Sequence, residues 1–384
     1  MEHVTFNAAL LSAVLCAYPD AQVEFAGERS HVAGVRDVVT RFGPPHGKRV
    51  SWTTLDIPKR DRTGWLRLMQ ELGQVSGVLS RARASDAGLV VFASVTNTGV
   101  VALKARTARW PVTVPVVCVM HGMINRIVGR WPIKPWNWPL NLRAVLRLPQ
   151  PKALWYLLLG PSLVRVLERL QPRLAAHFVS VDIPNLAYDQ DVGAAPAPTA
   201  PVPIRFGHLG VGNITKGFGS FARLAATIAP THPNAEFTLV GHLGAFRDDT
   251  DFSSVVGVSS SMLPVDEYKR RAASLTYVVS LANPVDYRLA ASSSFIEALF
   301  YGKPGVYLRN EYIDYAFAAM GDIGYVCDSY EEVVDTVRAL AESFPVERYR
   351  QQVATIRAGR EMFQPESVGR QLRELVMRLR EDAA

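Results

Sequence analysis

Short apolar runs of strand length alternate with segments in which apolar residues recur every three or four positions. The first pattern is typical of strands buried in a parallel sheet, and the second of helices that cover its faces. The predicted strands of the first half cover residues 4–6, 22–26, 49–53, 88–93, 114–120, 153–159 and 177–181. The predicted helices cover residues 8–17, 63–83 and 162–170. In the second of these helices one stripe, expected to face the core, contains Trp65, Leu68, Leu72, Val75 and Leu79.

The same rhythm returns in the second half of the chain. Its predicted strands cover residues 204–209, 236–240, 276–281 and 305–308, and its helices 218–228, 265–273, 294–301, 330–342 and two further segments. Between the halves, residues 191–203 are rich in Pro and Ala and keep neither period, as in a linker. Strand–helix alternation indicates a right-handed parallel sheet in each half. We therefore expect an α/β protein with two Rossmann-like, doubly wound domains, at residues 1–190 and 204–360, and a cleft between them.

Composition narrows the class of protein. Hydrophobic residues make up 48% and charged residues 20% of the 384 residues, which is normal for a soluble globular protein. We expect no transmembrane helix, because no uninterrupted apolar run approaches ~18 residues. The N-terminus lacks the basic residues of a signal peptide. The three cysteines are far apart and form neither a metal pattern nor a disulfide framework, so we expect a reducing cytoplasm.

Charge is distributed unevenly along the chain. Residues 1–202 contain 23 Lys and Arg against 13 Asp and Glu, a balance of +10, whereas the rest has 19 against 22, a balance of −3. No acidic residue lies between Asp86 and Glu168, where ten basic residues occur. A block of one sign favours an anionic partner, although a solvated basic face would have the same composition.

A glycine-rich segment, residues 206–221, joins a predicted strand to a predicted helix. Glycines let the backbone approach a ligand closely, and a helix N-terminus attracts phosphate. Gly210, Asn213 and Lys216 are the candidate ligand contacts of this loop. Its spacing matches neither the dinucleotide fingerprint nor the P-loop, so an ordinary strand-to-helix turn remains the alternative.

A second candidate site lies at residues 287–308. Ser292, Ser293 and Ser294 precede a predicted helix, where hydroxyl groups and free amides would suit a diphosphate. Glu297, one turn further, would accept hydrogen bonds from a ribose diol. Ser294-x-x-Glu297 also matches a capping box, in which the side chains of Ser294 and Glu297 each accept a hydrogen bond from the other's backbone amide. The motif could therefore serve only to start the helix.

These motifs together resemble the nucleotide-sugar domain of GT-B glycosyltransferases, in particular glycosyltransferase family 4 and its relatives. The resemblance rests on Lys216-Gly217, on the strand at residues 237–241, and on Glu297-Ala298 before Gly302-x-Pro304. It implies that Lys216 contacts the donor diphosphate and Glu297 the ribose. It also implies that residues 361–384 form a C-terminal helix packed back on the N-terminal domain. The expected donor site further includes Gly241, His242 and Tyr287.

The chain departs from the family pattern at two places. The family often has an Arg shortly before the Lys, and residues 208–213 contain none. The family also often has a first Glu eight residues before the second, where this chain has Leu289. Asp286 and Tyr287 are the nearby candidates for its role. The choice between retention and inversion of the anomer therefore stays open.

Candidate acceptor contacts lie in the first half. His121 follows a predicted buried strand and is our candidate general base, with a strand-end His bonded to backbone as the alternative. Asn97 and Thr98 follow the preceding predicted strand and form a candidate acceptor loop. Residues 129–152 mix indoles with cations, which favours contact with an anionic membrane surface, although a proline-rich loop packing its Trp side chains would look similar. The membrane candidates are Arg130, Trp131, Lys134, Trp136 and Trp138.

We therefore expect a cytoplasmic, peripherally membrane-bound glycosyltransferase that moves sugar from a nucleoside-diphosphate sugar to a lipid-linked saccharide of bacterial surface polysaccharide assembly. Fixed positive groups would stabilise the leaving diphosphate, so we expect no metal and no cofactor. Nucleic acid is disfavoured as a partner because no recognised motif occurs and the second half is acidic. Two alternatives remain: a partner subunit without catalysis, and a sugar-nucleotide epimerase or hydrolase. The second would need acidic residues that residues 87–167 do not supply.

Overall fold

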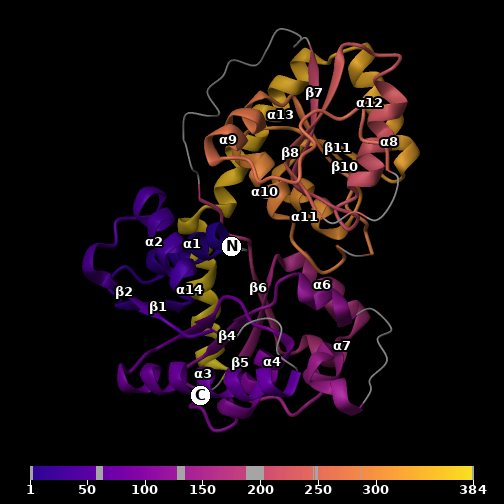
Figure 1. The fold of residues 1–384 in the computed structure, drawn as a ribbon. Coiled ribbons are helices and arrows are strands. Elements are labelled where there is room, and N and C mark those ends of the chain that lie inside the picture. The colour runs from indigo at the N-terminus through magenta and orange to yellow at the C-terminus, as the bar shows by residue number, and fades with distance from the viewer. Residues whose placement is uncertain are drawn as a thin grey trace. The chain divides into compact units, whose positions relative to one another are not determined.

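The chain forms two compact units, shown in the computed structural model of Figure 1. The N-terminal unit comprises Met1–Leu186, Leu289–Ala291 and Met362–Ala384, and the C-terminal unit comprises Ala187–Arg288 and Ser292–Glu361. The structure describes residues 3–57, 64–127, 135–186, 203–244, 246, 250–285 and 287–382.

The N-terminal unit contains two parallel sheets. Four strands pair in the order β3 (Val90–Phe92), β4 (Val116–Val119), β5 (Leu154–Leu159) and β6 (Phe178–Val181). A separate pair consists of β1 (Val23–Gly27) and β2 (Val50–Thr54). The helices are α1 (Val4–Ala17), α2 (Arg29–Phe42), α3 (Gly64–Ala84), α4 (Asn97–Thr107), α5 (Leu142–Leu146), α6 (Pro161–Leu170), α7 (Pro172–Ala175) and α14 (Pro365–Glu381). The 3₁₀ helices are η1 (Gly47–Arg49), η2 (Gly122–Ile127) and η3 (Pro135–Leu140).

The C-terminal unit is built on one parallel sheet of five strands. Their order is β11 (Gly324–Cys327), β10 (Gly305–Leu308), β9 (Tyr277–Ser280), β7 (Ile204–Gly212) and β8 (Ala235–Leu243). The helices are α8 (Phe218–Ile228), α9 (Val265–Ser274), α10 (Ser293–Phe300), α11 (Glu311–Met320), α12 (Tyr330–Glu342) and α13 (Val346–Gly359), with η4 (Arg360–Phe363) after them. The predicted α/β class with parallel sheets in both halves is confirmed.

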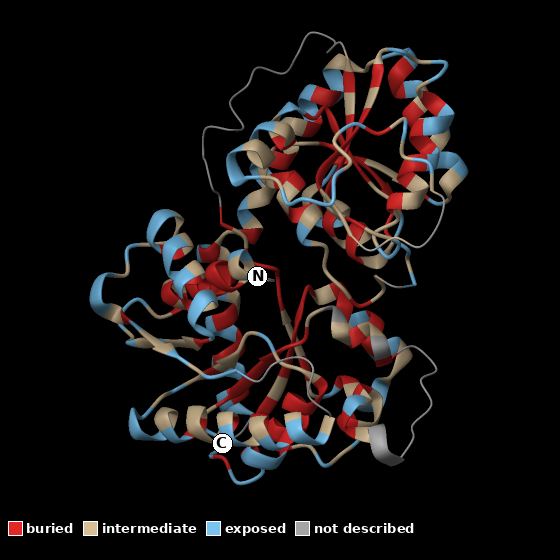
Figure 2. Cartoon of the chain, in the orientation of Figure 1, coloured by how far each residue is buried: buried red, intermediate tan, exposed pale blue. Residues whose placement is uncertain are grey.

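Successive side chains of the C-terminal sheet point to opposite faces, and helices cover both. Phe206, Phe237 and Tyr277 face a core shared with α8 and α12. Leu209 and Val240 face the opposite side, where α9 and α10 pack. Figure 2 shows the strands of this sheet as mostly buried. Burial on both faces is the reason that a strand such as β10 reads as an unbroken apolar run in the sequence.

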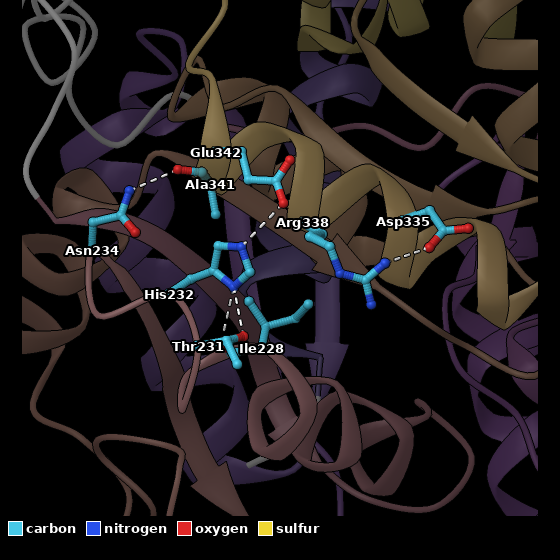
Figure 3. A network of polar contacts seen from close by, with 8 residues as sticks. All are labelled: Ile228, Thr231, His232, Asn234, Asp335, Arg338, Ala341 and Glu342. Atoms are coloured by element: carbon cyan, nitrogen blue, oxygen red, sulfur yellow. Dashed lines mark hydrogen bonds and ion pairs between the residues drawn. The ribbon is translucent and has the colours of Figure 1, made fainter.

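A polar network joins the turn after α8 to the end of α12 (Figure 3). The side-chain amide of Asn234 donates to the carbonyl of Ala341 at 2.7 Å. The imidazole of His232 lies 3.4 Å from a carboxylate oxygen of Glu342 and 2.8 Å from the hydroxyl of Thr231. These contacts tie the start of β8 to a helix more than one hundred residues later.

The beginning of the chain differs from the prediction at two places. Residues 4–6, predicted as a strand, are the first turn of α1. The reason is visible in the spacing, because Val4, Ala8, Leu11 and Leu15 continue one helical stripe, which packs in the core of the unit. Helix α2 was not predicted, although its buried Val32, Val35 and Val39 have helical spacing.

The predicted core stripe of α3 is correct only in part. Leu68, Val75 and Leu79 are buried, but Trp65 is exposed. The first turn of α3 lies beside η3, and the indole of Trp65 meets that of Trp138 edge-on with 6.0 Å between ring centroids. The periodicity therefore identifies the face of the helix that is buried. It does not show how far along the helix that burial extends.

The last helix, α14, belongs to the N-terminal unit and packs on α1. A Cβ atom at Gly369 would lie 2.7 Å from the carbonyl oxygen of Ala13, so the two helices approach too closely for a side chain there. The amide of Gln371 donates to Asp182, just after β6, at 3.0 Å. Helix α14 thereby connects α1 to the sheet. Within the described residues, no helix is both long and apolar enough to span a membrane.

Candidate functional site

The candidate site of the C-terminal unit begins at the loop between β7 and α8. Gly217 caps α8 with φ of 73°, and a Cβ atom there would lie 1.9 Å from the carbonyl oxygen of Leu281. Only glycine fits this close approach and this left-handed conformation. The side chain of Asn213 accepts a hydrogen bond from the backbone amide of Lys216 at 2.9 Å. These two constraints fix the loop that carries Lys216.

The backbones of β7 and β8 approach each other closely beside the Lys216 side chain. A Cβ atom at Gly241 would lie 1.9 Å from the carbonyl oxygen of Gly210. A Cβ atom at Gly210, where φ is 88°, would lie 3.0 Å from Nζ of Lys216. The ammonium group therefore lies directly over the backbone of Gly210. The sequence predicted both residues as ligand contacts, and the structure brings them together.

The serine cluster starts α10, but not as the capping box requires. Ser292 is the N-cap, and its hydroxyl accepts from the amide of Phe295 at 3.3 Å. Ser294 lies inside the helix, with its hydroxyl 3.1 Å from that of Ser292, and Ser293 is exposed. Glu297 does not cap this helix, since its carboxylate is engaged elsewhere. The capping-box interpretation, with Ser294 as the cap, is therefore wrong.

Glu297 of α10 is paired with Tyr268 of α9. The Tyr268 hydroxyl donates to Oε2 of Glu297 at 2.8 Å. Burial raises the pKa of Glu297, while this hydrogen bond and the charge of Lys216 oppose the rise. Burial lowers the pKa of Lys216, and the charge of Glu297 opposes that change. A cation and a carboxylate from separate elements thus share one partly buried site at the carboxyl ends of the strands.

Two residues of this region were not found from the sequence. Tyr268 contacts Glu297 across 29 positions, and nothing local in the sequence signals that pairing. His208, in β7, is buried with its ring 5.2 Å from that of Phe218. Burial, and secondarily the charge of Lys216, lower the pKa of His208 to about 3. His208 is therefore neutral at physiological pH and adds no charge to the site.

The remaining donor-site candidates and the neighbouring positions have the following places in the fold. His242 follows Gly241 in β8 and is partly buried. The backbone amide of Tyr287 donates to the carbonyl of Asn283 at 3.0 Å, and Asp286 lies outside the described residues. Leu289 is buried, as an apolar side chain would be expected to be. Their roles in ligand binding stay predictions.

In the N-terminal unit, His121 follows β4 and is bonded to backbone. Its Nε2 lies 2.9 Å from the carbonyl oxygen of Ala93. Its ring stacks on that of His3 at 4.7 Å and meets that of Phe6 edge-on at 4.5 Å. Burial, and secondarily His3, lower the pKa of His121 to about 4. The imidazole is therefore neutral near pH 7, and the backbone contact left open by the sequence is present.

The predicted acceptor loop is the first turn of α4, where both side chains are buried and bonded internally. Asn97 donates to the carbonyl of Leu140, and the Thr98 hydroxyl donates to Glu71 of α3. The Thr96 hydroxyl, which caps α4, donates to the same carboxylate at 2.7 Å. Glu71 is thus a buried acid that the sequence analysis did not single out. Glu71 lies outside residues 87–167, the stretch whose lack of acidic residues was the argument against an epimerase or hydrolase.

The candidate membrane residues lie largely outside the described residues. Arg130, Trp131 and Lys134 lie outside the described residues, as does the side chain of Trp136. Trp138 is partly buried against Trp65. Over the described ranges, no group of three or more His, Cys, Asp or Glu residues has the arrangement of a metal site.

Comparison with solved structures identifies the fold. Sucrose-phosphate synthase from Thermosynechococcus elongatus is 13% identical, with a TM-score of 0.65 over 97% of this chain and 92% of that one. HepE of Anabaena in complex with UDP is 13% identical, with a TM-score of 0.59 over 97% and 96%. A glycosyltransferase of Rickettsia africae is 9% identical, with a TM-score of 0.61 over 97% and 94%.

No protein-family model matches the chain, and no curated protein matches it by sequence. Identities this low establish architecture and leave activity to be argued from the site. Membership of family 4 in particular stays a prediction. The chain has the two-domain α/β fold of the GT-B glycosyltransferases, as its motifs predicted.

Proposed function

We propose that the protein transfers a sugar from a nucleoside-diphosphate sugar to an acceptor. The observation that carries the proposal is the grouping of Lys216 over Gly210 with Glu297 nearby, at the carboxyl ends of the strands. Parallel α/β sheets bind their ligands at this edge. A cation for phosphate and a carboxylate for a sugar diol are the groups that such a donor needs. That HepE, which has the same fold, was solved with UDP supports this choice of ligand.

In this mechanism Lys216 and the first amides of α10 hold the diphosphate. The bond between the anomeric carbon and the phosphate oxygen breaks, and negative charge grows on the leaving diphosphate. Lys216 and the helix N-terminus stabilise that charge without rearranging, which is where most of the rate enhancement would arise. The acceptor hydroxyl attacks the anomeric carbon and gives its proton to a base. His121 is the candidate, and it would accept the proton on Nδ1, because its Nε2 lies against the carbonyl of Ala93. Glu297 accepts hydrogen bonds from the ribose and orients the donor.

The reaction is proposed to be metal-independent. The chain contains the tripeptide Asp249-Thr250-Asp251, whose spacing is that of a metal-binding Asp-x-Asp motif. Asp249 lies outside the described residues, and Asp251 accepts from the amide of Ser253 at 2.8 Å. Transfer that continues unchanged after EDTA treatment is the expected result. Loss of transfer on EDTA and its return on adding Mg²⁺ or Mn²⁺ would refute metal independence.

The acceptor is proposed to be a lipid-linked saccharide at the cytoplasmic face of a bacterial membrane, in surface polysaccharide assembly. Support comes from the charge asymmetry, because the balance of +10 lies in residues 1–202. A basic surface would favour both anionic headgroups and a pyrophosphate-linked lipid. Transfer assayed with membranes and with soluble saccharides separates this acceptor class from a free sugar.

Donor binding is the direct test. We expect one of UDP-, GDP- or dTDP-sugars to raise the melting temperature, and Lys216→Ala to abolish that shift. Lys48→Ala is the matched control, because Lys48 is an exposed lysine of the N-terminal unit. A shift that persists in Lys216→Ala would contradict the assignment of Lys216. If neither Lys216→Ala nor Glu297→Ala lowers sugar transfer by membranes, the protein is a partner subunit instead.

The second candidate is a sugar-nucleotide epimerase or hydrolase. The observation that favours it is Glu71, a buried carboxylate beside the first turn of α4. Incubating the protein with the donor alone tests it. Conversion or hydrolysis of the sugar nucleotide without acceptor, lost in Glu71→Gln, would establish this candidate over transfer.

A further inference from the structure

The first turn of α1 contains a buried amide with an unsatisfied oxygen. Asn7 is 5% exposed, and among the described residues no group bonds to its Oδ1. A buried polar atom without a hydrogen bond costs free energy, and folded proteins contain few of them. The oxygen therefore marks a place where a polar group from outside the chain would complete the hydrogen bonding.

A histidine of α2 orients this amide. Nδ2 of Asn7 lies 2.7 Å from Nε2 of His31. An amide nitrogen only donates, so Nε2 of His31 accepts and the ring proton is on Nδ1. Burial lowers the pKa of His31, the charge of Glu28 opposes this change, and the charge of His3 adds to it. His31 is therefore neutral near pH 7 and keeps the lone pair that holds Nδ2. With Nδ2 held in this way, the position of Oδ1 is fixed as well.

The same turn of α1 lies against the candidate base. The ring of His3, which caps α1, stacks on that of His121 at 4.7 Å. The ring of Phe6 meets that of His121 edge-on at 4.5 Å. His31 follows β1 and His121 follows β4, so both come after the carboxyl ends of parallel strands, where α/β proteins bind their ligands. Asn7 and His121 are thus in the same part of the N-terminal unit.

The groups around the amide suit a hydroxyl. A sugar hydroxyl can donate to Oδ1 of Asn7, whereas an ionised phosphate oxygen only accepts. Neither Lys nor Arg is among the described groups whose charge acts on His31 or His121, and the carboxylate of Glu28 disfavours an anion. We propose that Oδ1 of Asn7 accepts a hydrogen bond from a hydroxyl of the acceptor's sugar ring, with His31 as the residue that positions the amide.

This assignment rests on the proposed function, because it names the part of the acceptor that the N-terminal unit binds, which is the sugar ring and not its phosphate. Ser12 of the same helix shows the contrast with Asn7. It is equally buried, but its hydroxyl donates to the carbonyl of Ala8 at 2.9 Å. The hydrogen bonding of Ser12 is completed within α1, so Ser12 needs no group from outside the chain.

Binding of simple saccharides tests the proposal with the full chain. Saturation-transfer NMR with methyl glucoside, methyl mannoside and methyl galactoside should show binding of at least one of them, and inorganic phosphate should not displace it. Asn7→Leu replaces the amide by an apolar group of similar shape and should weaken that binding about tenfold. Ser12→Ala is the matched control and should bind like the unchanged protein.

Two variants of His31 test its positioning role and decide the matter if Asn7→Leu does not fold. His31→Phe removes the acceptor that holds Nδ2 of Asn7 and should weaken saccharide binding. His31→Gln should restore most of it, because a glutamine oxygen can accept from the same nitrogen. If His31 served packing alone, the ring of Phe would replace it better than Gln, and the order of the two variants would be reversed.

Three outcomes would overturn the proposal. They are no binding of any of the methyl glycosides to the unchanged protein, displacement of the saccharide by phosphate, and unchanged binding by the folded variants of Asn7 and His31, as expected if only a buried water completes Oδ1. The thermal shift with sugar nucleotides should persist in each variant, which checks folding. Absence of that shift in the unchanged protein would refute the proposed function and leave the saccharide result standing.

Discussion

The hydroxyl of Tyr268 donates to the carboxylate of Glu297 at 2.8 Å, linking α9 to α10 on one face of the C-terminal sheet. Burial disfavours the charged form of Glu297, and this hydrogen bond favours it. Tyr268 therefore opposes the protonation of a buried carboxylate, which we propose as the acceptor for ribose hydroxyls.

Replacing Tyr268 by Phe should move the pH dependence of donor binding. Without the hydrogen bond the pKa of Glu297 rises further above its ordinary value. Glu297 is therefore protonated at a higher pH in the variant than in the unchanged protein. As pH is lowered, donor affinity should begin to fall at a higher pH than in the unchanged protein. In this acidic range (the acid limb of the pH profile) the variant should bind the donor about tenfold more weakly. Calorimetry with the nucleoside diphosphate that binds best, across a pH series, measures this.

Glu297→Gln is the reference for that series. It should bind weakly at every pH and show no acid limb. A Tyr268→Phe variant with an unmoved limb would mean that Tyr268 serves packing alone, because a packing defect lowers affinity without shifting the pH at which it falls.

Gly217→Ala should damage both folding and donor binding. The new Cβ atom would lie 1.9 Å from the carbonyl oxygen of Leu281, and the backbone has positive φ. We expect unfolding free energy to drop by about 1–3 kcal/mol, with the Lys216 loop displaced. Gly73→Ala is the matched control, because nothing lies within 4 Å of its new Cβ and helix α3 continues there. Denaturant unfolding should show Gly73→Ala to be neutral or stabilising, and the same result for Gly217→Ala would contradict the close approach.

His208 should make the protein less stable in acid. Its pKa is about 3 in the folded chain, against an ordinary value of 6.5. The unfolded chain therefore binds the proton first, and stability is lost as pH falls from 6.5 towards 3. His208→Leu should flatten part of this decline in unfolding free energy measured between those limits. His121, with a pKa of about 4, contributes in the same direction, so the decline should shrink without vanishing. An unchanged slope in His208→Leu would refute the burial of a neutral imidazole.

The network of Figure 3 offers a test of which polar contacts stabilise the C-terminal unit. Asn234→Ala removes the donor to the carbonyl of Ala341 and should cost about 1 kcal/mol of unfolding free energy. Arg338→Ala removes a surface ion pair with Asp335 and should cost less than about 0.5 kcal/mol. Parallel urea titrations compare the two. If the two variants lose the same unfolding free energy, the hydrogen bond between the α8–β8 turn and α12 does not stabilise the unit more than a surface ion pair does.

The parts of the fold that could be predicted from sequence are those in which local pattern and final environment agree. Strands buried on both faces, such as β10, appear as unbroken apolar runs, and α8 has the predicted bounds because its apolar stripe fills one core. Helix α4 was missed because it is buried nearly all round, so it has no polar stripe to mark its period. Trp65 was misplaced because periodicity does not say where a buried face ends.

The candidate site divides in the same way. Lys216 and Glu297 stood in recognisable motifs, so they were predicted as ligand contacts. Tyr268 was not found, because its contact depends on two helices meeting on one face of the sheet. The choice of Ser292 as the helix cap depends on where α10 begins, which a run of three serines leaves ambiguous.

The contact between α14 and α1 has a consequence for synthesis of the chain. Every residue of the C-terminal unit precedes Met362, whereas the N-terminal unit includes the last helix. The C-terminal unit is therefore synthesised in full before the helix that packs on α1 is added. The half that is made first is therefore the half that is completed last, and until then the surface of α1 that Gly369 covers has no packing partner.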